Sequence, residues 1–260
     1  INDPDPRSFK KSKFDLKKKK IKVIRGLSSK QIGYFYRSYL KSKKNNLPFV
    51  TCKLALSKDY FTINKKYKWI TNQYSRSRGH LLRSMHDCLL TSSQTILKDN
   101  SQLTCRINGL SDRTPTIAIL DNNLKLNTNL KVFKNFKKNR IIIFHNKINK
   151  KKMNTFKILK VKFLRVPLNK DGDLDLKKIL LNLKKLGFSR ILLESGRYLT
   201  TNFLNENLVD DLNLFISNKK LNKNGSGSLK KYLVPFLKNK KKITIKVNLF
   251  GDSLFSYKLK

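Results

Sequence analysis

The stretch that decides the fold begins at residue 48 and reads Pro48-Phe-Val-Thr-Cys-Lys-Leu-Ala-Leu-Ser-Lys-Asp59. Its apolar and β-branched residues predict a buried strand over 49–56. Lys53 lies inside that strand among apolar or small neighbours. Because an unpaired buried ammonium is costly, we expect Lys53 either to meet a partner or ligand or to reach water from an edge strand. Asp59 is then either its partner or a turn residue.

Aromatic and basic residues follow at short intervals. Trp69 is the only tryptophan, and it is either a core residue or a platform for a flat ligand. Thr71 is expected to cap the helix that follows. Arg83 and Arg106 occur in a chain whose cations are mostly lysine, which indicates either a bidentate contact with a phosphate or carboxylate, or a salt bridge.

Polar residues also mark two predicted ligand-binding elements. Thr95 and Asp99 share one face of a short helix and suit either ribose and amide groups or ordinary capping. Glu194 ends a predicted strand, and Ser195-Gly196 opens a helix that runs through Leu204. Ligands of open α/β sheets bind outside the carboxyl ends of strands, and helix N-termini attract phosphates. We therefore expect an anionic ligand beside Gly196.

Short apolar runs alternate with helical periodicity along the chain, which predicts an α/β layer fold. The expected strands are 49–56, 87–92, 116–121, 141–145, 160–164, 190–194, 211–217, 243–250 and 253–259. The last two should form a hairpin at an antiparallel edge. The clearest helix begins after Asp175 as N-cap and ends at Gly187. Near the N-terminus we expect a short strand at 21–24 and a helix from Ser28 or Ser29 through Leu40.

The 260 residues carry a formal net charge of +43, which usually indicates nucleic acid as a partner. However, the lysine clusters are not interleaved with aromatic side chains, so we expect solvated faces and no nucleic-acid partner. Lysines interrupt every apolar run before the roughly 20 residues that a membrane helix needs. The three cysteines and three histidines lack metal-site or disulfide spacing, which predicts a reduced, cytoplasmic protein without a metal.

In their order along the chain, these elements resemble the reductase domain of the bifunctional riboflavin-biosynthesis pyrimidine deaminase/reductase, over residues 48 to about 222. The residues that carry the resemblance are Lys53, Trp69-Ile-Thr71, Arg83, Thr95, Asp99, Leu103, Arg106, Asp121-Asn122, Glu194 and Gly196. The resemblance implies a dihydrofolate-reductase-like α/β fold, with a mixed, mostly parallel sheet and helices on both faces. It also implies that 1–46 are the end of a deaminase domain and 47–260 the reductase domain.

The resemblance implies that NADPH reduces the ribosyl C1′ of 5-amino-6-(5-phosphoribosylamino)uracil. Lys53 and Glu194 would be catalytic, with Lys53 assisting the opening of the ribosylamine. The implied cofactor contacts are Ala55, Trp69, Thr95, Asp99, Asn122, Gly196, Arg197, Tyr198, Leu199, Thr200, Thr201 and Asn202. The implied substrate contacts are Tyr67, Arg83, Leu103, Arg106 and Glu194, with the two arginines clamping the phosphate. A homo-oligomer is implied as well.

The chain also departs from the family pattern. The deaminase zinc signature, H-x-E with P-C-x-x-C, is absent, so we expect no deamination by this chain. Asp59-Tyr60 replaces Asp-Gly, which predicts a rebuilt turn. Tyr67 replaces a small hydroxyl residue, and Arg197 stands in a changed loop, where it either meets a cofactor phosphate or marks a changed site. The chain begins with Ile, so we expect it to continue a longer one. Two alternatives stay open: an inactive scaffold or dimerisation module for a deaminase, and an RNA binder.

Overall fold

The computed structural model describes residues 5, 7, 11–24, 29–134 and 140–260, which fall into two units. One unit comprises Ile1–Phe49 with Leu180–Ser189, and the other comprises Val50–Ile179 with Arg190–Lys260. The predicted division between residues 46 and 47 stays a prediction.

The first unit contains two helices, α1 (Lys11–Lys18) and α2 (Ser29–Asn45), and the C-terminal half of α6 (Leu176–Lys185). The predicted helix over Ser29 to Leu40 is confirmed and continues to Asn45, whereas Ser28 lies outside the described residues. The predicted strand at 21–24 is wrong, because these residues have no regular structure. Ile21 and Ile24 are both exposed, so the run lacks the buried face that stabilises a short strand.

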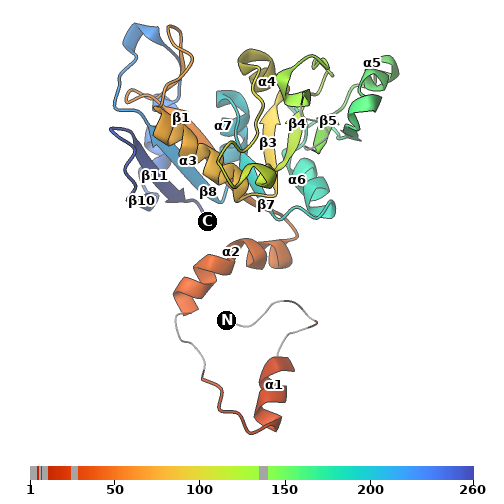
Figure 1. Cartoon of the computed structure of the whole chain (residues 1–260), viewed down its shortest axis with the longest axis vertical. Coiled ribbons are helices and arrows are strands. Elements are labelled where there is room, and N and C mark those ends of the chain that lie inside the picture. Colours follow the sequence, from red (N-terminus) through yellow and green to blue (C-terminus); the bar gives the residue numbers. More distant parts are fainter. Residues whose placement is uncertain (1–4, 6, 8–10, 25–28, 135–139) are drawn as a thin grey trace. The chain divides into compact units, whose positions relative to one another are not determined.

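A nine-stranded sheet forms the centre of the second unit, in the order β10-β11-β8-β1-β7-β3-β4-β5-β6 (Figure 1). The strands are β1 (Phe49–Leu56), β3 (Cys88–Ser92), β4 (Thr116–Leu120), β5 (Ile141–His145), β6 (Lys162–Arg165), β7 (Arg190–Leu193), β8 (Asp211–Ile216), β10 (Lys242–Thr244) and β11 (Ser253–Lys258). The pairs β8 with β1, β7 with β3, β3 with β4, β4 with β5, and β5 with β6 are parallel. The pairs β8 with β11 and β11 with β10 are antiparallel. The predicted mixed, mostly parallel class and its antiparallel C-terminal edge are confirmed.

The last predicted strand pair differs from the structure in length. The hairpin is present, but β10 ends at Thr244 and not at 250, although the apolar alternation continues to Leu249. The Val247 N–H bonds the Ile245 carbonyl of its own segment at 2.9 Å, so this stretch turns and does not extend the ladder. A separate two-stranded ribbon was not predicted. It pairs β2 (Phe61–Asn64) with β9 (Gly225–Ser228), whose Gly-Ser-Gly-Ser sequence gives no strand signal.

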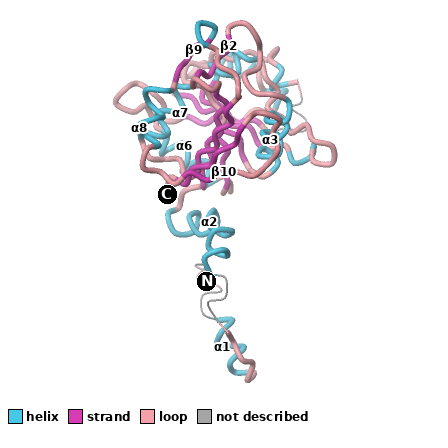
Figure 2. Tube along the Cα trace, turned by 90° about the vertical axis from the view of Figure 1, so that its left-hand side faces the viewer, coloured by secondary structure: helices cyan, strands magenta, loops and turns pink. Residues whose placement is uncertain are grey.

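Helices lie on both faces of the sheet: Figure 2 shows α3 (Gln73–Ser84) on one side and α7 (Arg197–Asn205) and α8 (Lys230–Leu237) on the other. The shorter α4 (Ser93–Asp99) follows β3 directly, and α5 (Lys150–Thr155) precedes β6. Apolar side chains of β3, β4 and β5 join those of α4 and the 124–133 loop in one core cluster. This core holds the central strands rigidly, so that their carboxyl ends can present polar side chains.

The helix ends follow local capping chemistry. The predicted N-cap Asp175 accepts a hydrogen bond from the Lys178 backbone N–H at 2.9 Å, and Gly187 has the left-handed φ of +93° expected after a helix. The prediction that Thr71 caps α3 is wrong by one residue. Asn72 is the N-cap, because its side-chain oxygen accepts the Ser75 N–H at 3.0 Å while its amide bonds the Leu249 carbonyl.

Candidate active site

Side chains of β1 alternate between the two faces of the sheet, which decides the environment of Lys53. The Cys52 thiol meets the Thr200 hydroxyl of α7, whereas the Lys53 Cε lies 3.8 Å from where a Cβ on Gly79 of α3 would stand. Lys53 therefore points toward α3. Because β1 lies between β8 and β7, the edge-strand alternative for Lys53 is wrong.

Asp59 is a turn residue, as one of the two alternatives predicted. Its carboxylate accepts hydrogen bonds from the Ser57 hydroxyl and from the backbone N–H groups of Leu221 and Asn222. It is therefore not the partner of Lys53.

Glu194 and Arg83 form a bidentate ion pair on the α3 face. The Arg83 Nε and Nη2 donate to the two carboxylate oxygens at 2.9 and 2.8 Å. The Arg83 side chain is only 14% exposed and that of Glu194 only 10%. Burial alone would raise the pKa of Glu194, but the charge and hydrogen bonds of Arg83, together with the Lys53 charge, hold it at about 2. The carboxylate is therefore ionised at neutral pH.

Lys53 completes this group as a cation held close to the pair. Burial lowers the pKa of its ammonium, and the Glu194 charge offsets part of that effect while Arg83 adds to it. Among the described residues, Lys53 makes no ion pair. Its Nζ lies 5.6 Å from the centroid of the Phe215 ring. An amine with a lowered pKa beside a fixed carboxylate is suited to exchange a proton with a ligand.

The segment that follows α4 brings the second predicted arginine to the same place. Thr104 lies between the buried Leu103 and the exposed Arg106, and its carbonyl accepts Arg83 Nη1 at 2.9 Å. Burial lowers the pKa of Arg106, and the nearby Arg83 charge lowers it further. The structure thus brings Lys53, Glu194 and both arginines into one electrostatic group. For Arg83 the salt-bridge alternative is what the structure contains.

A cavity of about 860 Å³ opens at the carboxyl edge of the sheet, and we call it the carboxyl-end cavity. It is lined by the end of β3, by α4, by the turn after β4, by the 172–176 loop and by the N-terminus of α7. Its size is within the roughly 300–1,000 Å³ typical of small-molecule and cofactor sites. None of Lys53, Arg83, Arg106 and Glu194 lines this cavity. The link between the cavity and the polar group is along the chain, because Gly196, which lines the cavity, follows Glu194 by two positions.

Half of the predicted cofactor residues line this cavity: Asn122, Gly196, Arg197, Tyr198, Leu199 and Asn202. Thr95 adjoins it, since its hydroxyl accepts the Gly196 N–H at 3.1 Å. The Asn122 Oδ1 is buried without a hydrogen-bond partner among the described residues. An unsatisfied buried acceptor is costly unless a ligand or water completes it, so Asn122 is suited to hold a donor group.

The other predicted contacts lie elsewhere. Thr200 is buried against Cys52, Thr201 bonds its own helix, Ala55 packs against the Phe215 and Leu254 cluster, and Asp99 is exposed. Trp69 and Tyr67 are 52% and 62% exposed. The core alternative for Trp69 is therefore wrong: its ring lies under the Arg76 guanidinium, 4.9 Å from the centroid.

Two groups of the site were not predicted. Asp173 lines the carboxyl-end cavity and accepts hydrogen bonds from Tyr198 and Asn202. A signal existed, because Asp171, Asp173 and Asp175 crowd three of the chain's 16 acidic residues into one turn. His80 lies beside Arg83, and a single histidine on a helix gave no signal of that position.

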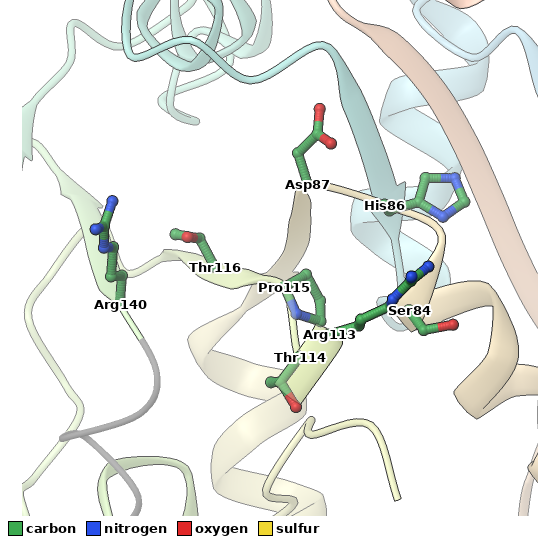
Figure 3. A pocket seen from close by; sticks show the side chains of 8 residues that line it. All are labelled: Ser84, His86, Asp87, Arg113, Thr114, Pro115, Thr116 and Arg140. Atoms are coloured by element: carbon green, nitrogen blue, oxygen red, sulfur yellow. The ribbon is translucent and has the colours of Figure 1, made fainter. Parts of the chain in front are cut away.

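A second hollow of about 370 Å³ lies at the opposite, amino-terminal ends of β3 and β4 (Figure 3). Its lining includes Asp87, Arg113 and Arg140, whose side chains point in different directions in Figure 3 and do not converge on one point. Because ligands of parallel sheets bind at the carboxyl ends of strands, the carboxyl-end cavity is the stronger candidate site.

The described residues contain no cluster of three or more histidine, cysteine, aspartate or glutamate side chains arranged to hold a metal ion. The helices described are also too short or too polar to span a membrane. The cysteines at 52, 88 and 105 are buried, as predicted.

These features define a mixed α/β domain with its candidate site at the carboxyl edge of the sheet. Solved structures of the same fold include RibD of Acinetobacter baumannii, with a TM-score of 0.80 and 22% identity over 99% of this chain and 70% of that one. A deaminase/reductase of Thermotoga maritima superposes with a TM-score of 0.79 and 24% identity, over 98% and 69%. The riboflavin biosynthesis reductase Rib7 of Saccharomyces gives 0.64 and 20%, over 87% and 98%.

The chain belongs to the family of the RibD C-terminal domain, whose model matches residues 48–235. Among curated relatives, the riboflavin biosynthesis protein RibD of Aquifex aeolicus is 29% identical over 84% of this chain and 59% of the relative. That of Escherichia coli is 27% identical over 87% of this chain and 64% of the relative. The chain thus spans about three fifths of the length of these relatives.

Proposed function

We propose that the chain is the reductase of riboflavin biosynthesis that transfers a hydride from NADPH to the ribosyl C1′ of 5-amino-6-(5-phosphoribosylamino)uracil. The observation that carries the proposal is the polar group of the α3 face, in which Lys53 stands beside the buried Glu194–Arg83 pair. Gly196, two residues after Glu194, lines the carboxyl-end cavity. Family membership supports the same reaction.

The carboxyl-end cavity fits a dinucleotide such as NADPH. The N-terminus of α7 supplies backbone N–H groups and a helix dipole for the phosphates, and Arg197 adds a cation there. The unsatisfied Asn122 Oδ1 is an acceptor for an amide or ribose donor. Lys98 and Lys125 line the same cavity and favour an anionic ligand.

NADPH would supply the hydride, and the chain's own residues would bind and orient the substrate. We assign to Lys53 the transfer of a proton to the ring oxygen as the ribosylamine opens, because its ammonium has a lowered pKa. Glu194, fixed by Arg83, would hold that ammonium in place and accept substrate hydroxyl or amine donors. Arg106, exposed and without an ion pair among the described residues, would bind the phosphate.

The division of labour between the arginines differs from the implied clamp. The Arg83 guanidinium already donates three hydrogen bonds, to Glu194 and to the Thr104 carbonyl. It therefore cannot also bind a phosphate in a bidentate manner. Arg106→Ala should therefore raise KM for the phosphorylated substrate, whereas Arg83→Ala should lower kcat and stability.

The test is NADPH oxidation followed at 340 nm with the purified chain and 5-amino-6-(5-phosphoribosylamino)uracil. Substrate-dependent oxidation supports the proposal. If the folded protein oxidises no NADPH in the presence of substrate while a known pyrimidine reductase does, the alternative of an inactive scaffold for a deaminase gains support. Replacing NADPH with NADH in the same assay gives the cofactor preference.

A further inference from the structure

His80 is a titratable side chain that the proposed reaction leaves without a role. It lies on α3, one turn before Arg83, and it is half buried. Its Nδ1 is 3.0 Å from the Thr104 carbonyl oxygen. A carbonyl only accepts hydrogen bonds, so this Nδ1 carries the proton and donates it. The 3.4 Å approach of Arg83 Nη1 to the same nitrogen is then a contact between two donors and not a hydrogen bond.

Two donors from α3 therefore converge on one acceptor. The Thr104 oxygen receives Arg83 Nη1 at 2.9 Å in addition to His80 Nδ1, and a carbonyl oxygen has a lone pair for each. The Cys105 thiol donates a hydrogen bond to the His80 backbone carbonyl at 3.5 Å. The segment Leu103–Arg106 is thus attached to α3 at consecutive residues.

These contacts hold the backbone at Leu103 in a strained conformation. Leu103 has a φ of +57°, in the left-handed region that a branched side chain disfavours, and its side chain is only 4% exposed. Such a conformation persists only where surrounding contacts determine it. Arg106 follows Leu103 by three residues, so its position depends on the same turn.

We infer that His80 is a positioning residue, which fixes the Thr104 carbonyl and thereby holds Arg106 where it binds the phosphate of the substrate. The inference rests on the proposed function, because Arg106 is assigned to the substrate phosphate there. His80 acts only through the backbone of Leu103–Arg106 and touches no reacting atom. Only its Nδ1 makes the hydrogen bond to the Thr104 carbonyl, so Nε2 is not needed for this role.

Amide variants separate the two ring nitrogens. The Nδ2 of asparagine can stand where Nδ1 stands in histidine, whereas the amide of glutamine reaches the place of Nε2. His80→Asn should keep KM for the substrate within about threefold of the wild type, whereas His80→Gln and His80→Ala should each raise it about tenfold or more, as expected when one hydrogen bond that orders a ligand site is lost. KM for NADPH should change in none of them.

A matched control is present in the same unit. His145 donates from Nδ1 to the Lys147 carbonyl at 2.8 Å, but it lies at the end of β5 and contacts neither arginine. His145→Ala should lower the melting temperature and leave KM for the substrate unchanged. A general loss of stability would therefore be recognised as such.

Binding of D-ribose 5-phosphate, measured by calorimetry, gives a readout that does not require turnover. His80→Gln should weaken it about tenfold, His80→Asn should not, and Arg106→Ala should abolish it. If His80→Gln binds and reacts like the wild type, or if His80→Asn is impaired as strongly as His80→Gln, the inference is wrong. If the wild type binds the sugar phosphate but reduces no substrate, the proposed function fails while the role of His80 is still decided by binding.

Discussion

At the scale of single residues, Tyr60 tests how the chain replaces a family glycine. Tyr60 adopts a left-handed φ of +68°, and its N–H bonds the Ser57 carbonyl at 2.9 Å. For a residue with a Cβ, this backbone conformation costs about 1 kcal/mol of free energy. We expect Tyr60→Gly to be more stable than Tyr60→Ala by about 1 kcal/mol in urea unfolding, since both variants lose the ring and only glycine relieves the backbone. Equal stabilities would contradict the strain.

Because Tyr60 adopts the left-handed conformation that glycine favours, it is not by itself an argument for the inactive-scaffold alternative. Tyr67 still departs from the family, but its side chain is 62% exposed.

Lys53 is the residue on which the chemistry depends most. Lys53→Met keeps the length of the side chain and removes a buried charge, so the free energy of unfolding should stay the same or rise. Turnover should fall about 100-fold or more, the usual contribution of a positioned proton donor. The exposed Lys58→Met serves as the control and should keep wild-type kcat. An unchanged kcat in Lys53→Met would remove this residue from the mechanism.

For single residues, the sequence predicted which side chains form the site better than it predicted which partners they bind. The pattern singled out Lys53, Glu194 and both arginines, and the structure brings them together. It could not assign Arg83 to Glu194 rather than to a ligand, because residues 111 positions apart meet only through the fold. His80 was missed for the same reason, whereas the acidic turn around Asp173 was a local signal that the prediction did not use.

At the scale of elements, caps and glycines fixed the boundaries that were predicted well. The helix α6 begins after Asp175 as expected, because the carboxylate satisfies an otherwise unpaired N–H. Asp175→Ala should lower the free energy of unfolding by about 1 kcal/mol, whereas Asp175→Asn should retain most of it, since asparagine caps equally well. Chemical denaturation of both variants checks this, and a similar loss in both would mean that charge rather than capping matters.

Other elements were predictable only as far as burial follows apolar pattern. The strand 141–145 agrees with β5 at both ends, because five consecutive residues are buried. The run at 21–24 has similar side chains but gains no burial, and the β9 strand has no apolar side chain at all. Pairing with distant residues decides such cases, and it is not visible in a local window.

At the scale of the whole molecule, the half-buried His80 and the buried His86 predict loss of stability in acid. Burial lowers the pKa of both His80 and His86 to about 4, below the value near 6.5 of an unfolded chain. Between these values the unfolded chain binds protons that the folded protein does not, so the free energy of unfolding should fall as the pH drops from about 6.5 to about 4. Urea titrations at pH 7, 5.5 and 4.5 measure this, and His86→Asn should flatten the dependence. Equal stability at pH 7 and 4.5 would contradict it.

The central claim is that this fold delivers a hydride to the C1′ of the phosphoribosylaminouracil. The most direct measurement uses NADPH deuterated at both C4 positions of the nicotinamide and mass spectrometry of the product. Our account predicts a ribityl product that carries one deuterium, located at C1′. A reduced product without deuterium, or no reduced product from folded protein supplied with cofactor and substrate, would contradict it.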